Sequence, residues 1–526
     1  MSWESFVVGL YLRRFRVPRD LLRVAATRYA DRTALVTEHG SLTFPQLADR
    51  VWRLAHALAA RGIGHGDRIG YVASGGQDQI EILLASYELG AVLIGFTPVH
   101  PLEVIEAALT EAPPKIFFND ATVRPDVEEM LTRAFPDVAR ISDLAAQEAL
   151  ILAGRPVVQG TRISPDDLSG LGFTSGTTGR PKAITVTHGV WLTSLRLSVL
   201  NVRVKMGGHD VALPGMPISG AGSGLILPSL AGGATLVLPR DYSTASLIDA
   251  IETHRATRIF VTPSTLIDLL DWPDLDQRDL SSVTNIIYGT APTPSTKIAE
   301  AVRRFGAILQ QGYGMAEVLP PVSLLQSEQH GVGHEPAPRA VLRSVGKPVP
   351  QVKVRIVTED GQPLAPGERG QVEVQSPTVF RGYWCQPELT ALAFRDGYLR
   401  TRDYGYLDTD GRLVILDRDV DVIVRGEESV YPREVEEAVH EHPAVKEAVV
   451  VTDDDGQLVL AVSLRRAWRD KPEDDVRRDL ADHLSRLPDA QRPDRVVVLP
   501  ELPRSYLNKV LRREIRDALT SLEDPT

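Results

Sequence analysis

Short apolar segments alternate with segments of helical periodicity through the first two thirds of the chain. Apolar residues recur at helical spacing in 21–32 and 44–62, and glycines follow the second segment. DRIGYVA (67–73) has the pattern of a short buried strand, and a helix and strand pattern follows it in 78–96. The same rhythm returns at 258–270. Strands that alternate with helices predict a mostly parallel sheet covered by helices.

The pattern changes near residue 340. Residues 345–377 alternate apolar and polar side chains around the turns EDGQ and PGERG, which is typical of antiparallel hairpins. A chain of 526 residues is also too long for one ordinary core. The sequence therefore predicts an α/β protein with a large multi-subdomain N-terminal domain (1–417) of parallel sheets flanked by helices, which includes a small antiparallel β-rich subdomain at about 340–417. A small mobile α+β domain follows at 418–526.

Composition excludes several classes of protein. The net charge of −11 argues against general binding to nucleic acid or anionic membranes. No run of eighteen apolar residues is present, so we expect no stable membrane insertion. The single cysteine, Cys385, rules out an internal disulfide and a multi-cysteine metal site. The N-terminal residues 1–18 lack the charge pattern and cleavage site of a signal peptide, and we expect them to pack on the body. A cytoplasmic location fits these features.

FTSGTTGRPK (173–182) places four hydroxyl side chains and two glycines just before a lysine. Alone, the stretch fits either a turn between two strands or a loop that binds an anion. Glycines and small polar residues allow backbone N–H groups to converge on an anion, and Lys182 adds a positive charge. The stretch differs from the common nucleotide P-loop, because Pro181 lacks an N–H and the following residues have a strand pattern.

FTSGTTGRPK resembles the phosphate-binding signature of the adenylate-forming superfamily, which includes acyl- and aryl-CoA synthetases, the adenylation domains of peptide synthetases, and beetle luciferases. Four further motifs resemble those of the family and follow in the family order. IIYGTAPTP (286–294) is similar to its adenine-side loop, and QGYGMAE (311–317) is similar to its Tyr-Gly-x-Thr-Glu motif. The segment 398–423 resembles its ribose motif, and LPRSYLNKVLRREI (502–515) resembles its C-terminal lysine motif.

The resemblance implies an ATP site. Tyr313 would stack on adenine, Asp403 would accept from both ribose hydroxyls with support from Arg418, and Glu317 would hold Mg²⁺. The candidates for catalysis are Lys509, Lys182 and Glu317, and Glu317 is also the candidate metal ligand. The candidates for binding ATP or AMP are Thr174, Ser175, Gly176, Thr177, Thr178, Gly179, Gly289, Thr290, Ala291, Pro292, Gly312, Tyr313, Gly314, Met315, Asp403 and Arg418.

The segment after VALPGMP normally lines the acid pocket in this family. Here it is small and uncharged, without the aspartate that amino-acid-activating relatives usually carry. We therefore expect a large apolar or ring-bearing carboxylic acid. The candidate pocket residues are Pro217, Ile218, Ser219, Gly220, Ala221, Gly222, Thr290 and Gly312.

The implied reaction is ATP-dependent activation of a carboxylic acid to acyl-AMP with release of pyrophosphate, followed by thioester formation with CoA. ATP, Mg²⁺ and CoA are the implied cofactors, and a homodimer is an expected assembly. Four positions depart from the family pattern: Ala316 replaces threonine, Arg402 and Glu427 replace glycines, and Val420 replaces a charged hinge residue. These departures leave two alternatives open. One is adenylation only, with acyl-AMP passed to a partner ligase or carrier, and the other is a nucleotide-binding pseudoenzyme.

Overall fold

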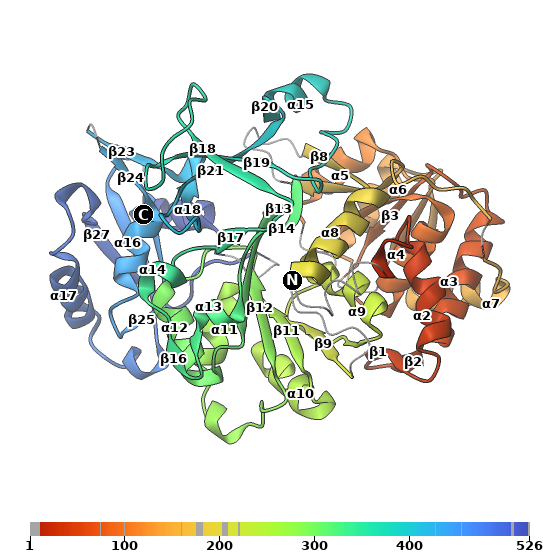
Figure 1. The fold of residues 1–526 in the computed structure, drawn as a ribbon, viewed down its shortest axis with the longest axis horizontal. Helices are drawn as coiled ribbons and strands as arrows, with labels where there is room; N and C mark the ends of the chain where they lie inside the picture. Colours follow the sequence, from red (N-terminus) through yellow and green to blue (C-terminus); the bar gives the residue numbers. More distant parts are fainter. Residues whose placement is uncertain are drawn as a thin grey trace.

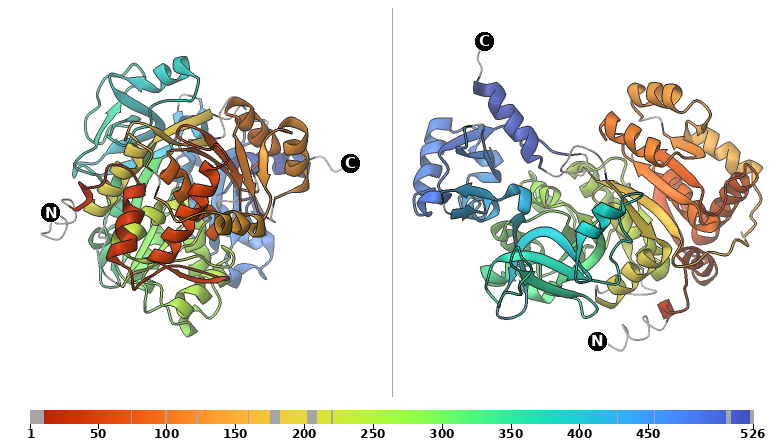
Figure 2. Two further views of the ribbon diagram at one scale, coloured as in Figure 1. Left: turned by 90° about the vertical axis from the view of Figure 1, so that its right-hand side faces the viewer. Right: turned by 90° about the horizontal axis from the view of Figure 1, so that it is seen from above.

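Two large sheets with helices on their faces form the body of the molecule, and an antiparallel sheet and a C-terminal unit lie beside them (Figure 1). Figure 2 shows the C-terminal unit and the six-stranded sheet at opposite ends of the molecule. The computed structural model describes residues 11–73, 75–98, 100–120, 123–158, 160–174, 182–201, 209–218, 221–426, 428–453, 455–505 and 510–523.

The six-stranded sheet has the order β6-β5-β3-β4-β7-β8, and only its last pair, β7 and β8, is antiparallel. Its central strands are apolar along almost their whole length, because helices bury both faces of the sheet. The strands are β3 (Arg68–Val72), β4 (Val92–Phe96), β5 (Ile116–Asn119), β6 (Ala139–Ile141), β7 (Leu168–Thr174) and β8 (Lys182–Thr187). The helices are α2 (Arg19–Arg28), α3 (Phe44–Ala59), α4 (Gln77–Leu89), α5 (Leu102–Glu111), α6 (Pro125–Ala134), α7 (Leu144–Ala153), α8 (His188–Asn201) and α9 (Ile226–Gly232).

The nine-stranded sheet has the order β17-β14-β13-β12-β11-β9-β10-β1-β2. The six strands from β13 to β1 in this order run parallel, and the strands at both ends are antiparallel to their neighbours. The strands are β1 (Thr33–Thr37), β2 (Gly40–Thr43), β9 (Val211–Pro214), β10 (Thr235–Val237), β11 (Arg258–Val261), β12 (Asn285–Gly289), β13 (Leu309–Met315), β14 (Val318–Leu325) and β17 (Lys347–Pro348). The main helices are α10 (Thr244–His254), α11 (Pro263–Leu270) and α12 (Ser295–Phe305).

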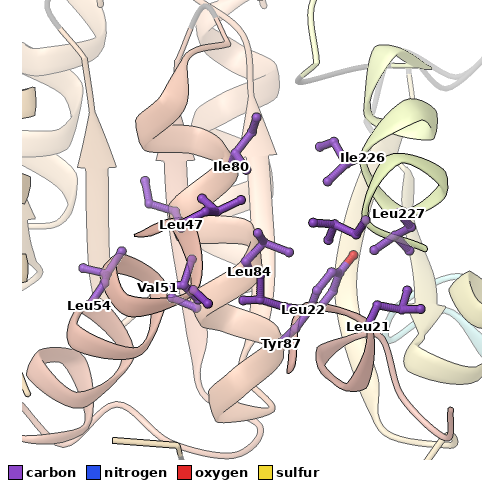
Figure 3. Packing of buried hydrophobic residues seen from close by; sticks show 14 of the residues in the cluster. Leu21, Leu22, Leu47, Val51, Leu54, Ile80, Leu84, Tyr87, Ile226 and Leu227 are labelled. Atoms are coloured by element: carbon purple, nitrogen blue, oxygen red, sulfur yellow. The ribbon is translucent and has the colours of Figure 1, made fainter. Parts of the chain in front are cut away.

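The two sheets share a core built from helices α2, α3, α4 and α9. Figure 3 shows leucine, isoleucine and valine side chains of these helices facing one another. Helix α3 begins at a capping box, in which Thr43 Oγ1 accepts from Gln46 N while Gln46 Oε1 accepts from Thr43 N. Leu54 is fully buried in this core. The apolar side chains of 44–62 thus pack helix α3 into the core between the two sheets, and these sheets carry candidate site residues.

An antiparallel sheet follows, with β18 (Lys353–Val357), β19 (Gly370–Gln375), β20 (Phe394–Arg395), β21 (Tyr398–Leu407) and β22 (Leu413–Arg418), and α15 (Pro387–Ala393) precedes β20. Short elements lead into it: α13 (Ser327–His330), β15 (Gly331–Val332), β16 (Glu335–Pro336) and α14 (Arg339–Leu342). The C-terminal unit has the hairpin β23 (Ile423–Arg425) and β24 (Glu428–Val430), then α16 (Pro432–Val439), β25 (Val445–Thr452), β26 (Leu458–Leu464), α17 (Glu473–Leu484), β27 (Arg495–Leu499) and α18 (Arg512–Glu523).

Polar contacts join the C-terminal unit to helix α12 of the body. Glu437 of α16 accepts from the backbone N of Ser295 at 3.1 Å and also from its hydroxyl. Lys297 Nζ donates to the backbone oxygen of Val445 at 2.8 Å, and Lys297 is only 2% exposed. Buried polar contacts of this kind hold the C-terminal unit in one orientation on the body, because each group would lose its hydrogen-bond partner if α12 and the C-terminal unit separated.

Burial of Lys297 lowers its pKa from 10.5 to about 7. Between pH 7 and about 10.5 the unfolded chain keeps this proton and the folded protein releases it, so stability rises with pH in that window, at most by about 1.4 kcal/mol per pH unit. Replacing Lys297 by methionine is expected to remove this rise, as measured by urea unfolding at pH 7.5 and pH 9. The exposed lysine variant Lys353→Met serves as the control, and an unchanged rise in Lys297→Met would contradict the assignment.

The predicted fold class is confirmed, with parallel sheets flanked by helices, an antiparallel sheet and a C-terminal α+β unit. The division into domains at residues 417 and 418 stays a prediction. Residues 1–10 lie outside the described residues, but Leu12, Phe15 and Val17 are buried. None of the helices in the described part of the chain has the length and apolar character that crossing a membrane requires.

Candidate nucleotide site

The glycine- and hydroxyl-rich loop connects two paired strands. Thr174 at the end of β7 lies opposite Lys182 at the start of β8, so the two ends of the loop are antiparallel neighbours in the sheet. The candidates Ser175, Gly176, Thr177, Thr178 and Gly179 lie outside the described residues. The anion-binding role of this loop therefore stays a prediction, while its two ends have fixed positions.

Lys182 and Glu317, which are far apart in the sequence, both contact Tyr383. The ammonium nitrogen of Lys182 lies 5.5 Å from the centroid of the Tyr383 ring. The hydroxyl of Tyr383 donates to Glu317 Oε1 at 3.2 Å. The structure therefore brings the candidate phosphate-binding lysine and the candidate metal ligand into contact with one tyrosine side chain.

Tyr313, Asp403 and Arg418 form a second cluster. Tyr313 Oη donates to Asp403 Oδ2 at 2.5 Å, and Arg418 Nε lies 3.6 Å from Asp403 Oδ1. Asp403 and Arg418 are also directly opposite each other in the β21–β22 pair. Burial and the neighbouring carboxylate of Asp403 raise the pKa of Tyr313, so its hydroxyl stays protonated and acts as a donor. The three residues to which the resemblance assigns adenine and ribose binding thus touch one another.

The adenine-side loop lies beside the tyrosine motif, because β12 and β13 are parallel neighbours. Gly289 pairs with Gly312, and a Cβ on Gly289 would lie 2.7 Å from the Gly312 oxygen, so this approach requires glycine. Thr290 follows with a φ of +74°, in the left-handed region that is unusual for a β-branched residue. Backbone strain of this kind is concentrated at functional sites. The remaining candidates of these two loops are Ala291, Pro292, Gly314 and Met315.

The candidate acid-pocket segment lies at the end of β9 and is only partly described. Ile218 is buried and packs near Gly75, where an added Cβ would lie 3.1 Å from Ile218 Cγ1. Pro217 is half-buried. Gly222 lies so close to Met216 that an added Cβ would meet its backbone oxygen at 2.7 Å. Ser219 and Gly220 lie outside the described residues, and Ala221 begins a 3₁₀ turn that leads into α9.

Lys509 lies outside the described residues, but both flanks of its segment are anchored. On one side, Arg504 pairs with Asp268 of α11 at 3.1 Å and with Glu447 of β25. On the other side, Arg512 pairs with Glu436 at 2.7 Å at the start of α18. The segment that carries Lys509 is therefore held to the body through α11 and to the C-terminal unit through α16 and β25.

Comparison with known proteins adds independent evidence. The model of the AMP-binding enzyme family matches residues 22–384, and that of the AMP-binding enzyme C-terminal domain matches residues 434–509. The first match alone covers more than half of the chain.

The chain belongs to the AMP-binding enzyme family.

Relatives of this AMP-binding enzyme share most of its length. The medium/long-chain fatty acid–CoA ligase FadD8 of Mycobacterium tuberculosis is 32% identical over 94% of this chain and 89% of its own. A feruloyl-CoA synthase of Amycolatopsis is 30% identical over 92% of this chain and 95% of its own. Among solved structures, the amide bond synthetase McbA of Marinactinospora thermotolerans has a TM-score of 0.81 at 29% identity, covering 95% of this chain and 99% of its own. The predicted superfamily and the class of AMP-forming acid–CoA ligase are confirmed.

Sequence reasoning missed Tyr383 as a member of the AMP-binding enzyme's site. Its segment RGYWCQPELT lies outside every motif from which the site was predicted. The signal that could have found it is an aromatic pair, Tyr383 and Trp384, directly after an arginine and a glycine in a polar stretch. Only the fold shows that β8 runs beside this segment, where Ile184 and Tyr383 form an isolated bridge.

The four departures from the family pattern differ in their structural consequences. Arg402 keeps a left-handed backbone with a φ of +64°, which explains why the family uses glycine there. Its guanidinium Nε donates to Asp419 Oδ2 at 2.8 Å. Ala316 and Val420 are exposed. Gly426 has a φ of +63° at the tip of the β23–β24 hairpin, and Glu427 lies outside the described residues.

Replacing Arg402 by glycine is expected to stabilise this AMP-binding enzyme by about 1 kcal/mol. Relief of the left-handed strain contributes about 1–2 kcal/mol, and loss of the half-exposed ion pair with Asp419 subtracts a few tenths to about 1 kcal/mol. Urea unfolding measures the change. The variant Asp419→Ala, which loses the same ion pair without relieving strain, is the control and should be neutral or slightly destabilised. Equal destabilisation of both variants would show that strain at residue 402 is unimportant.

Proposed function

We propose that the protein activates a carboxylic acid with ATP to form acyl-AMP and pyrophosphate, and then transfers the acyl group to CoA. The observation that carries the proposal is the contact of Tyr313 with Asp403 and of Asp403 with Arg418. These residues come from distant segments, and a pair of acceptor oxygens between a flat ring and a cation suits the ribose and adenine of a nucleotide.

Two anions must meet in the first step, so the residues of this chain position the reactants and neutralise charge. A carboxylate oxygen attacks the α-phosphorus, a new oxygen–phosphorus bond forms, and the bond to the pyrophosphate oxygen breaks. We assign Lys509 to the charge shared between the carboxylate and the α-phosphate. Lys182 and the hydroxyl-rich loop 174–179 would hold the β- and γ-phosphates.

Glu317 fits a magnesium ion. Magnesium binds ATP enzymes through one or two carboxylates together with phosphate oxygens, and Glu317 Oε1 already has a defined donor in Tyr383. When bound, the ion supplies positive charge at the phosphates. Within the described residues, no cluster of three or more acidic, histidine or cysteine side chains could hold a metal ion.

In the second step, the thiolate of CoA attacks the acyl carbon, a carbon–sulfur bond forms, and AMP leaves. We place the division between the two domains at residues 417 and 418, so that Lys509 and Arg418 belong to the C-terminal unit and the other residues assigned to ATP belong to the N-terminal domain. For the acid we propose a large apolar or ring-bearing molecule, since the segment 217–222 is small and uncharged. A cytoplasmic homodimer is the assembly that we expect.

A second candidate has support from one comparison. The likeness to an amide bond synthetase favours an amine as an alternative acyl acceptor, in which case nitrogen would replace sulfur in the second step. The departures from the family pattern suggest an enzyme that forms acyl-AMP without making a thioester. Such an enzyme is compatible with an amine as the acyl acceptor. Both candidates share the acyl-AMP intermediate.

A product screen separates these candidates. Fatty, aryl and polycyclic acids are incubated with enzyme, Mg²⁺ and ATP, each with CoA, with a primary amine, or with neither. The proposal expects pyrophosphate release that depends on the acid and an acyl-CoA product in the CoA arm. An amide in the amine arm without acyl-CoA in the CoA arm supports the second candidate. Absence of acid-dependent pyrophosphate release with every acid would support a pseudoenzyme.

A further inference from the structure

We propose that Tyr383 is a positioning residue that keeps Lys182 and Glu317 apart and correctly oriented for the pyrophosphate end of magnesium-bound ATP. The inference rests on the proposed function, because it assigns Tyr383 a role within the same site. It concerns a residue outside the motifs from which the site was predicted.

Tyr383 contacts both a cation, the ammonium group of Lys182, and an anion, the carboxylate of Glu317. The Lys182 ammonium is 5.5 Å from the ring centroid, within the range of a cation–π contact. The Tyr383 hydroxyl donates to Glu317 Oε1 at 3.2 Å.

The backbone around Tyr383 is fixed from three directions. The Trp384 N–H donates to the oxygen of Ala183 on β8 at 2.8 Å, directly beside Lys182. The Phe380 N–H donates to the backbone oxygen of Glu317 at 2.8 Å. The Tyr383 N–H donates to Thr390 Oγ1 at 2.9 Å. The same short segment thus binds the main chain beside the lysine and the main chain of the glutamate.

The two opposite charges also contact Tyr383 rather than each other. Both side chains are described, and the structure shows no ion pair between Lys182 and Glu317; the lysine lies over the ring and the glutamate accepts from the hydroxyl. A direct ion pair would neutralise both groups in the absence of ATP, and each would have to be released before binding phosphate or magnesium. The ring holds the lysine by its face and the glutamate by its hydroxyl, so each group keeps its charge for the ligand.

Two substitutions separate these contributions. Tyr383→Phe removes the hydroxyl and keeps the ring, so we expect it to act through Glu317 and to raise the Mg²⁺ concentration for half-maximal ATP–pyrophosphate exchange about 3- to 10-fold. At saturating Mg²⁺ its exchange rate should approach that of the wild type. Tyr383→Leu also removes the ring, so we expect it to weaken binding of ATP in the presence of EDTA, which Tyr383→Phe should leave within twofold.

The experiment uses the full chain and measures exchange against free Mg²⁺ and, by calorimetry, ATP binding with Mg²⁺ and with EDTA. Tyr398→Phe is the matched control, because the Tyr398 ring lies under Arg355 at 4.1 Å and outside the candidate site. An unchanged Mg²⁺ dependence in Tyr383→Phe would overturn the inference, as would an equal shift in Tyr398→Phe. A loss of folding in Tyr383→Leu, detected by thermal unfolding, leaves Tyr383→Phe as the deciding variant. If the wild type shows no acid-dependent exchange, the proposed function is wrong, and the calorimetric comparison still decides the role of Tyr383.

Discussion

Replacing Lys509 by alanine is expected to lower acid-dependent ATP–pyrophosphate exchange by at least about 100-fold. A positive charge at the point where the carboxylate meets the α-phosphate stabilises charge that is shared only in the transition state, and removal of one such group typically costs about 10²- to 10³-fold in rate. Binding of ATP alone should change little, because we assign Lys182 and Asp403 to other parts of the nucleotide. Exchange measures the first quantity and calorimetry the second.

Arg513→Ala is the matched control for Lys509→Ala. Arg513 lies four residues further along the chain, in α18, and its side chain is 91% exposed, so its loss removes the same charge from the same unit without touching the site. It should retain exchange within about twofold. Exchange near the wild-type rate in Lys509→Ala would remove Lys509 from the mechanism, even though Arg504 and Arg512 anchor its segment on both sides.

Replacing Asp403 by alanine is expected to weaken ATP binding about 10- to 100-fold. The carboxylate would accept from the ribose hydroxyls, and the net loss of one hydrogen bond to a charged group, about 1.5–3 kcal/mol, corresponds to about this change. The change also leaves the Tyr313 hydroxyl without its acceptor and removes the carboxylate beside Arg418. The Michaelis constant for ATP and the dissociation constant from calorimetry should rise together.

Asp410→Ala tests whether the effect is specific to the site. Asp410 is an exposed carboxylate that pairs with Arg412 in the turn between β21 and β22. Its loss removes one negative charge close to the same strand, and ATP binding should remain within about twofold. Deoxyadenosine analogues give a second readout, since Asp403→Ala should lose the preference of the wild type for ATP over 2′-deoxy-ATP. A retained preference would contradict the assignment of Asp403 to ribose.

Much of the fold follows from local patterns in the sequence. The apolar stripe at 44–62 predicts α3. The segment DRIGYVA at 67–73, which is uncharged from Ile69 on, predicts a short buried strand, and helices do cover both faces of that sheet. The turns EDGQ and PGERG predict the antiparallel sheet that contains β18 and β19. Each of these patterns involves residues that are close together in the sequence, so it can be recognised without knowledge of the tertiary structure.

The candidate site could be predicted from the sequence only for those residues that lie within a recognisable motif. Tyr313, Asp403 and Arg418 each lie within a recognisable segment, and the structure places them in contact. Tyr383 was not predictable, because its role depends on pairing between β8 and a segment about two hundred residues away. The buried contact of Lys297 with Val445 was also missed, since an isolated lysine in a helix pattern is ordinarily exposed.

The left-handed backbone at Arg402 shows a different limit. The family pattern marks the position as glycine, but the sequence alone does not tell whether the local geometry changes to suit arginine or whether arginine accepts the strain. The structure shows the second outcome, with a φ of +64° and an ion pair to Asp419. Strain persists here because β21 is paired with β19 on both sides of the residue, at Arg400 and at Tyr404, and with β22 from Asp403 onward.

Analysis of the nucleotide products tests the central claim most directly. Wild-type enzyme is incubated with ATP, Mg²⁺ and an acid identified in the screen, without CoA or amine, and the products are separated by mass spectrometry. The account predicts acyl-AMP and pyrophosphate, formed only when the acid is present and absent in Lys509→Ala. Formation of ADP and phosphate, or of AMP at a rate independent of the acid, would contradict it.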